Sequence, residues 1–176
     1  CIRDSTLTDN VTSSADGIVV ERDDIVVDGA GHIVQGTGSG AGITLSSDNV
    51  TIRNTNIQGF WNGIYLNSAE WNAVSANNLT NNGCGIELDE SSNNIIIGNN
   101  ITAGAYGIEL YGSFNTVKNN NISFHSTTGI GVHGSNNTLI DNTVTNILET
   151  GIFLDANNNT ICKNNVSSAW AGIYVG

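Results

Sequence analysis

Residues 85–101 read GIELDESSNNIIIGNNI, and this stretch recurs along the chain with a nearly constant period. Its first element, Gly-Ile-x-(Leu/Val), begins at glycines that lie 21 to 25 residues apart. These glycines are Gly17, Gly42, Gly63, Gly85, Gly107, Gly129, Gly151 and Gly172. Self-similarity at a fixed period of this length indicates a repeat architecture in which each unit stacks on the next.

A second element, Asn-x-(apolar)-x-x-Asn-x-(apolar), follows the middle copies of the first. Its two asparagine positions hold Asn72, Asn94, Asn115, Asn137 and Asn159, and then Asn77, Asn99, Asn120, Asn142 and Asn164. Val50 and Thr55 fill these two positions in the earliest full repeat. Stacked units would place these asparagines in columns, where their amides can hydrogen-bond along the stacking axis.

The period is too short for two helices and a turn, and the apolar residues inside it are two apart, as in a strand. The remaining solution is an all-β chain, a parallel β-helix of about eight 21–22-residue coils with uncapped ends and a rise of about 4.8 Å per coil. The crossover rule makes the helix right-handed. We expect one domain over residues 1–176, with initial coils and a Gly-rich loop in 1–41, six regular coils in 42–171 and a partial coil in 172–176.

Composition agrees with this fold and restricts the partners. The chain has 28 Asn, 21 Gly and no Pro. Asn and Gly suit the sharp turns of every coil, and Pro would remove a backbone N–H that the strand ladders need. Its formal net charge of −11 argues against a nucleic-acid partner. No apolar run is long enough to span a membrane. The chain begins at Cys1 without an initiator methionine, so we expect a processed or excised chain.

The repeat resembles the NosD-like, or CASH-type, right-handed parallel β-helix family of carbohydrate-binding proteins and sugar hydrolases. GIELDESSNNIIIGNNI resembles a regular coil of that family, and residues 15–34, ADGIVVERDDIVVDGAGHIV, resemble its opening coil. The resemblance runs from about Asp16 to Gly176. It implies the fold, and it permits carbohydrate binding or polysaccharide degradation.

Outward positions can be compared coil by coil because the repeats are in register. Glu87, Asp89 and Glu109 fall on one face in adjacent coils, where they suit a retaining-glycosidase pair, a Ca²⁺ site or a solvated acidic surface. His133 and Asp155 are also neighbours, and we interpret them as a surface hydrogen bond. No Lys or Arg joins this face, which counts against a lyase. The five basic residues are Arg3, Arg22, Arg53, Lys118 and Lys163.

No cofactor is expected. The three His and three Cys are scattered and Met is absent, so the sequence shows no copper or zinc ligand cluster. Two similar aromatic patches, Trp61 with Tyr65 and Trp170 with Tyr174, lie five coils apart. They suit stacking on a sugar or on another subunit, or simply cover the corners of the rod.

Covalent modification is a further prediction. Eight Asn-x-Ser/Thr sequons are candidate N-glycosylation sites: Asn10, Asn49, Asn78, Asn100, Asn121, Asn136, Asn158 and Asn165. The three cysteines fall in different columns, so they are poorly placed to pair with one another. We therefore assign Cys1, Cys84 and Cys162 as candidates for intermolecular disulfides, with lipidation an alternative for Cys1.

The two ends of the chain suggest self-assembly. If a second copy followed Gly176, the distance from Gly172 to its Gly17 would equal one repeat, and the partial coils would form a full one. Thr6 is the weak member, because it falls where Val74 is apolar. The contact would involve Cys1, Ile2, Leu7, Val11, Ile173, Tyr174 and Val175.

We therefore predict an extracellular, non-enzymatic structural protein that assembles head to tail into a surface filament, sheath or layer. The near absence of loops between Gly42 and Gly172 favours this over a catalytic cleft. The alternative is a carbohydrate-binding or polysaccharide-degrading β-helix protein that uses Glu87, Asp89 and Glu109.

Overall fold

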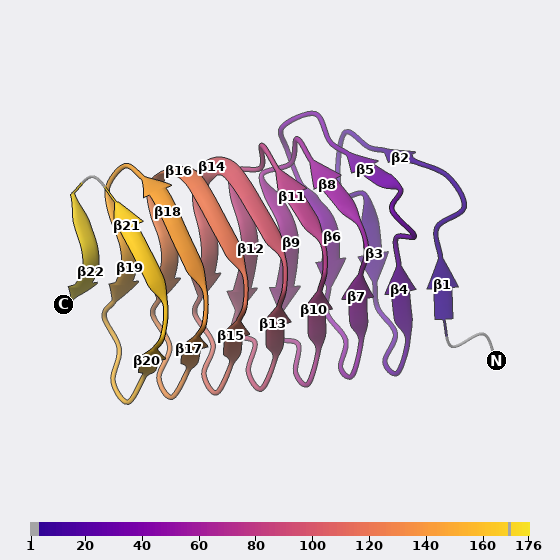
Figure 1. Cartoon of the computed structure of the whole chain (residues 1–176). Helices are drawn as coiled ribbons and strands as arrows, with labels where there is room; N and C mark the ends of the chain where they lie inside the picture. Colours follow the sequence, from indigo (N-terminus) through magenta and orange to yellow (C-terminus); the bar gives the residue numbers. More distant parts are fainter. Residues whose placement is uncertain (1–3, 169) are drawn as a thin grey trace.

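The chain winds as a parallel β-solenoid (Figure 1), seen here in a computed structural model that describes residues 4–168 and 170–176. Each coil contributes short strands to three faces, and every strand pairs in parallel with its equivalents in the neighbouring coils. The first face has one strand per coil and eight strands in all, which confirms the predicted fold and number of coils. The described residues contain no helix long and apolar enough to cross a bilayer.

The first face is a ladder of three-residue strands. Its members, in spatial order, are β1 (Asp4–Thr6), β4 (Val26–Asp28), β7 (Thr51–Arg53), β10 (Ala73–Ser75), β13 (Ile95–Ile97), β15 (Thr116–Lys118), β17 (Thr138–Ile140) and β20 (Thr160–Cys162). Successive side chains of each such strand point alternately into the core and toward solvent.

The second and third faces share one sheet of 14 strands. The second face comprises β2 (Val11–Thr12), β5 (Ile33–Gln35), β8 (Asn56–Gln58), β11 (Asn78–Thr80), β18 (Thr143–Ile147) and β21 (Asn165–Ser168). The third face comprises β3 (Ile18–Val20), β6 (Ala41–Leu45), β9 (Asn62–Asn67), β12 (Cys84–Asp89), β19 (Thr150–Leu154) and β22 (Ala171–Val175). Two long strands, β14 (Asn100–Leu110) and β16 (Asn121–Val132), run through both faces and join them.

The core consists of columns of aliphatic side chains. Each motif from Gly42 to Gly151 contributes an Ile and a Leu or Val to the interior of the third face, as Ile86 and Leu88 do, both fully buried. Val74 from the first face and Leu79 from the second meet them inside. Burying each such side chain stabilises the fold by about 1.5–3 kcal/mol, and every regular coil repeats the set.

Buried asparagine ladders fix the turns between the faces. The Asn99 side chain accepts from the Asn77 backbone N–H at 3.0 Å and donates to the Val74 carbonyl at 2.9 Å. Its amide also donates to the Asn120 side chain at 3.0 Å, as predicted for a column of amides. The Asn94 side chain instead binds two backbone groups of the preceding coil, accepting from the Asn72 N–H and donating to the Ala69 carbonyl. The two columns thereby satisfy backbone groups that a sharp turn leaves unpaired.

The motif glycine is required because strand alternation is broken at this point, with the glycine and the isoleucine after it both on the inner side. A Cβ on Gly107 would meet the Gly129 carbonyl and the Ile122 side chain inside the coil. The residue before the glycine is consequently turned toward the outer surface, beside the x position of the motif. The third face therefore carries outward side chains three residues before the x position, where strict alternation predicts inward ones.

The register of the first strand corrects one prediction. Joining two copies at their ends aligns Thr6 with the apolar position of Val74, but β1 instead aligns Ser5 with Val27 and, through the ladder, with Val74. The predicted alignment of β1 with the later repeats is therefore wrong by one residue. The alignment is right at β2, where Val11 aligns with Val34 and so with Leu79.

Candidate functional site

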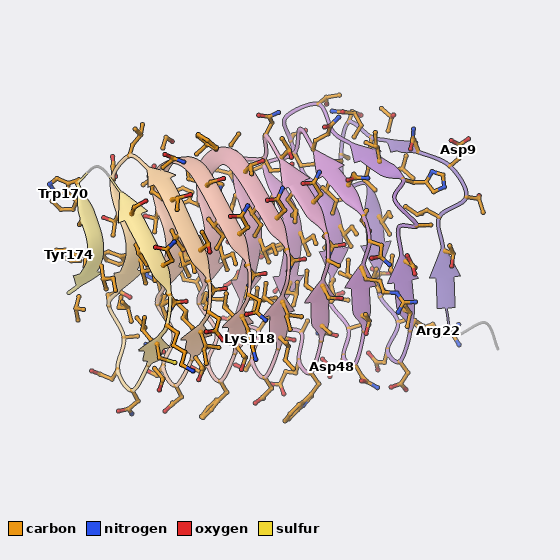
Figure 2. The ribbon with its side chains drawn as sticks, viewed as in Figure 1. Asp9, Arg22, Asp48, Lys118, Trp170 and Tyr174 are labelled. Carbon is orange, nitrogen blue, oxygen red and sulfur yellow. The ribbon has the colours of Figure 1, made fainter. Side chains whose placement is uncertain are left out.

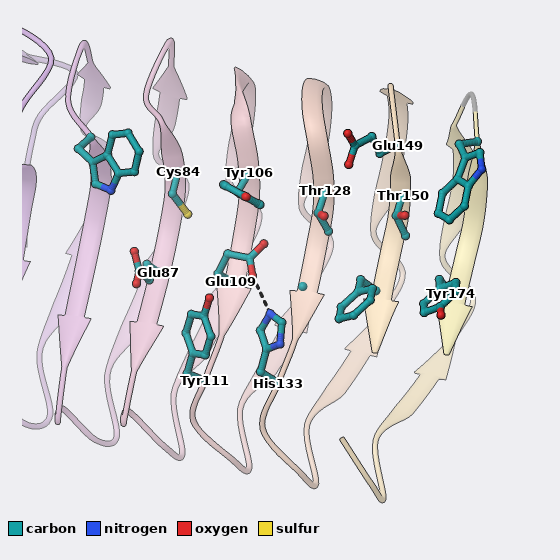
Figure 3. A pocket seen from close by; sticks show the side chains of 14 residues that line it. Cys84, Glu87, Tyr106, Glu109, Tyr111, Thr128, His133, Glu149, Thr150 and Tyr174 are labelled. Carbon is teal, nitrogen blue, oxygen red and sulfur yellow. Dashed lines mark hydrogen bonds and ion pairs between the residues drawn. The ribbon is translucent and has the colours of Figure 1, made fainter. Parts of the chain in front are cut away.

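A groove of about 610 Å³ follows the outer surface of the third face (Figure 3). Its walls come from side chains at the same few positions of successive coils, because the strands of this face are in register. The lining residues are Trp61, Cys84, Glu87, Tyr106, Glu109, Tyr111, Thr128, Gly131, His133, Glu149, Thr150, Phe153, Trp170 and Tyr174.

A carboxylate–imidazole–carboxylate cluster occupies the middle of the groove. His133 donates from Nε2 to Glu109 Oε2 at 3.0 Å and from Nδ1 to Asp155 Oδ1 at 3.0 Å. The hydrogen bond to Glu109 is the main cause that raises the pKa of His133 to about 9, and Asp155 adds to it. His133 is therefore an imidazolium at neutral pH, held between two carboxylates.

Gly131 makes this cluster possible. It occupies the x position of its motif, where the neighbouring coils carry Glu109 and Phe153. A Cβ at Gly131 would run into the carboxylate of Glu109. The missing side chain thus lets Glu109, which is 6% exposed, lean across to His133 in the next coil.

Aromatic rings extend from the cluster toward the last coil. Tyr111 stacks on His133 with ring centroids 4.6 Å apart, and Phe153 follows His133 at 5.7 Å. Phe153 and Tyr174 are stacked at 5.5 Å with their planes 3° apart, and Trp170 stacks on Tyr174 at 6.2 Å. The rings form a continuous row along the solenoid axis, and Trp170 and Tyr174 at its end are exposed (Figure 2).

The other end of the groove is formed by Trp61 and Glu87. Trp61 is 65% exposed, and its ring covers the backbone at Gly83. Burial is the largest contribution that raises the pKa of Glu87, while a hydrogen bond from Asn62 opposes it. Asn62 is 9% exposed, and its amide oxygen has no hydrogen-bond donor among the residues that the structure describes.

A second hollow of about 480 Å³ continues past Trp61 toward the first coils. Asp16 and Tyr65 line it, together with Asn62 and Trp61. Asp16 is held in place because it accepts hydrogen bonds from the Ala41 backbone and the Thr44 hydroxyl. Trp61 therefore stands between two hollows of the same outer surface.

The three acidic residues predicted as a site lie in neighbouring strands of this face, but each has its own partner. Glu109 binds His133, Glu87 binds Asn62, and Asp89 accepts from the Tyr65 hydroxyl at 3.0 Å. Burial, with the Asp89 hydrogen bond next, raises the pKa of Tyr65 to about 12. The two predicted aromatic patches lie at opposite ends of one groove, a relation that the spacing alone did not indicate.

Sequence reasoning missed two parts of the groove. The outward column that precedes each motif glycine includes Cys84, Tyr106, Thr128 and Thr150, and only the break in strand alternation at the glycine reveals it. The link between Glu109 and His133 was also missed, although Gly131 at an outward position between larger residues was a usable signal.

Sequence comparison assigns a family. The model of the family described as periplasmic copper-binding protein (NosD) matches residues 10–176. The chain belongs to the NosD family. No curated protein sequence matches it significantly.

Structures similar to this NosD family member share its fold. A periplasmic alginate epimerase, AlgG, has a TM-score of 0.72 at 19% identity, over 89% of this chain and 46% of that one. The pectate lyase Pel9A has a TM-score of 0.67 at 14% identity, over 92% and 54%. An alginate lyase from Paenibacillus sp. str. FPU-7 has 0.60 at 14% identity, over 92% and 88%. The chain spans about half the length of the epimerase and the pectate lyase.

The copper in the NosD family description has no matching ligand set in the described part of this chain. No group of three or more His, Cys, Asp or Glu there is arranged to hold a metal ion. Both ring nitrogens of His133 already bind carboxylates, and burial raises the pKa of the Cys84 thiol. The sequence has no Met to supply a thioether. These residues do not fit a copper site.

The predicted glycosylation sites differ in how available their amide nitrogens are. Asn100 and Asn121 donate along a surface ladder that also contains Asn78, each at 2.8 Å. Asn49 donates to Asp24 at 2.7 Å, whereas the Asn10 side chain accepts from the Ile33 backbone. The remaining sequons are exposed, two of them in left-handed turns: Asn136, Asn158 and Asn165. We therefore expect N-glycosylation at this last group to disturb the fold least.

The other predicted residues are distributed as follows. Cys84 is buried at 4% exposure, which disfavours it as an intermolecular disulfide partner, while Cys162 is partly exposed. Leu7 and Val11 pack against the core, and Ile173, Tyr174 and Val175 are exposed on β22. Cys1 and Ile2 lie outside the described residues.

Proposed function

We propose that this NosD family protein binds an extended glycan chain along the groove of its third face, in the cell envelope or outside the cell. The observation that carries the proposal is the row of stacked rings, because aromatic faces are the surfaces on which pyranose rings stack. Carboxylates and hydroxyls beside the rings supply the few polar groups that orient a ligand in an otherwise apolar cleft.

The dimensions of the groove suit an oligosaccharide. Trp61 and Trp170 precede motif glycines five coils apart, which corresponds to about 24 Å along the axis. An extended chain of pyranoses advances by about one coil rise per sugar. Each sugar would therefore meet an equivalent set of positions in the next coil.

Binding fits the central cluster better than catalysis does. At neutral pH both nitrogens of His133 carry protons that carboxylates accept, so the imidazole has no free lone pair with which to act as a general base. Glu109 is committed to the same hydrogen bond. The fold neighbours are described as an epimerase and lyases, and polysaccharide modification by Glu87 or Glu109 is the enzymatic alternative to our proposal.

Isothermal titration calorimetry with a panel of hexasaccharides tests the proposal. We expect Trp170→Ala to weaken binding by about tenfold, since the stacking ring is lost. Trp71→Ala is the matched control, because Trp71 is similarly exposed at 64% but does not line the groove. Equal losses in both variants, or no binding of any glycan, would contradict the proposal.

Head-to-tail assembly into a filament receives no support from the family or from the similar structures. The register at β1 also places Ser5 where the predicted junction needs an apolar residue. Analytical ultracentrifugation across a wide concentration range examines this point separately, and we expect no concentration-dependent polymer.

A further inference from the structure

The groove is negatively charged, whereas a groove that binds an acidic polysaccharide needs positive charges. Glu87, Glu109 and Glu149 line this groove, and Asp89 and Asp155 flank it on the same face. Among the described residues that line the groove, His133 is the only basic one. No strand of the third face contains Lys or Arg, nor do β14 and β16.

The basic residues of the described chain lie elsewhere. Lys118 is on the first face in β15 (Figure 2), and Arg53 in β7 pairs with Asp28 at 2.8 Å. Arg22 follows β3, and Lys163 occupies a left-handed turn after β20. A polyuronate in the groove would therefore place a row of carboxylates against Glu87 and Glu109, where the one positive charge, on His133, is already held between two carboxylates. Such a like-charge arrangement costs binding energy.

The end of the groove near Trp61 has an excess of hydrogen-bond acceptors. Glu87 is a half-buried carboxylate that receives a hydrogen bond from the Asn62 side chain. The Asn62 amide oxygen, buried and without a donor in the described structure, is a second acceptor. The face of the exposed Trp61 ring beside them attracts cations. A buried acceptor without a partner is costly, so a ligand that brings donors to this point gains energy.

We propose that the groove selects glycans that carry amino sugars, with a sugar ammonium group beside Glu87 and Trp61, and that it rejects polyuronates. This inference rests on the proposed glycan-binding function and names its ligand class. The ammonium group supplies three hydrogen-bond donors to the unpaired acceptors, and its positive charge is attracted by the negative potential of the groove.

The pH dependence follows from the same arrangement. Burial raises the pKa of Glu87, so its carboxylate takes up a proton sooner than an exposed one as the pH falls. A bound ammonium group favours the ionised carboxylate. Affinity for an amino-sugar glycan should therefore decrease as the solution is acidified through the Glu87 titration, and proton release should accompany binding on the acidic side.

The test compares three hexasaccharides by calorimetry at pH 6 in EDTA, which removes divalent cations. They are a glucosamine hexamer, cellohexaose and a galacturonate hexamer. We expect the glucosamine hexamer to bind about tenfold more tightly than cellohexaose, and the galacturonate hexamer not to bind detectably. Raising the salt concentration should weaken the first and leave the second unchanged.

Matched variants locate the effect. Glu87→Gln should weaken binding of the glucosamine hexamer about tenfold and leave cellohexaose unaffected. Asp141→Asn removes the same charge from an exposed turn remote from the groove and should change neither. Equal losses in both variants would overturn the inference.

The outcomes also distinguish this inference from the function on which it rests. Galacturonate binding in EDTA, or cellohexaose binding as tight as that of the glucosamine hexamer, overturns the amino-sugar selectivity while glycan binding stands. If none of the three hexasaccharides binds, both the inference and the proposed function fail.

Discussion

The imidazole of His133 and the carboxylate of Glu109, which come from adjacent coils, are joined by a hydrogen bond of 3.0 Å at the centre of the groove. Glu109 is nearly buried, so water screens this pair only weakly. Asp155 binds the opposite ring nitrogen from a more exposed position. The hydrogen bond between His133 and Glu109 therefore keeps the imidazole protonated at neutral pH in the middle of the groove.

His133 should titrate well above an ordinary histidine. We expect ¹⁵N NMR of the ring to show half-protonation near pH 9, where the hydrogen bond to Glu109 places its pKa. Since the folded pKa exceeds that of the unfolded chain, the stabilisation is complete below about pH 6.5 and is lost as the pH rises through about 9. Glu109→Gln should lower this pKa more than Asp155→Asn does. A midpoint near 6.5 in the native chain would contradict the geometry.

Gly131→Ala should separate Glu109 from His133, because the added Cβ meets the Glu109 carboxylate. We expect the pKa of His133 to fall and glycan affinity to decrease while the fold is retained. Gly172→Ala is the control, since a Cβ there has no neighbour within 4 Å. An unchanged His133 titration in Gly131→Ala would show that the carboxylate has another route to the ring.

Two adjacent asparagines should differ sharply in their effect on stability. Asn99→Ala leaves the Asn77 N–H and the Val74 carbonyl without their partners inside the solenoid, so we expect a loss of about 1–3 kcal/mol for each unsatisfied group. Asn100→Ala breaks only an exposed side-chain ladder and should change the free energy of unfolding by about 0.5 kcal/mol or less. Urea denaturation of both variants measures the difference, and similar losses would refute the assigned roles.

His125 should make the fold sensitive to acid. It is 2% exposed, its Nδ1 has no partner in the described structure, and burial lowers its pKa in the folded state. As the pH falls below about 6.5 the unfolded chain takes up a proton that the folded chain resists, so stability decreases. The drop in unfolding free energy between pH 7 and pH 5 should be smaller in His125→Gln than in the native chain. An equal drop in the two proteins would contradict this role of His125.

Much of the fold could be predicted from the sequence because the repeat is in strict register. The Asn columns predicted at Asn77 and Asn99 are found, and the Ile86 and Leu88 positions are buried as alternation requires. The first coil was less predictable. It lacks the second asparagine element, so β1 could slip by one residue against the repeat without breaking any visible pattern.

The sequence by itself determined that this chain is a stack of β-coils, because a period near 22 with apolar residues two apart has few other packed solutions. It also determined that the third face carries acids and aromatics but no Lys or Arg. Only the tertiary structure decided that these residues form one groove. The break in strand alternation at the motif glycine turns the residue before it outward, and the empty position at Gly131 lets Glu109 reach His133 across a coil boundary. Such contacts depend on the sizes of individual side chains in neighbouring coils, and a repeat pattern describes only what the coils have in common.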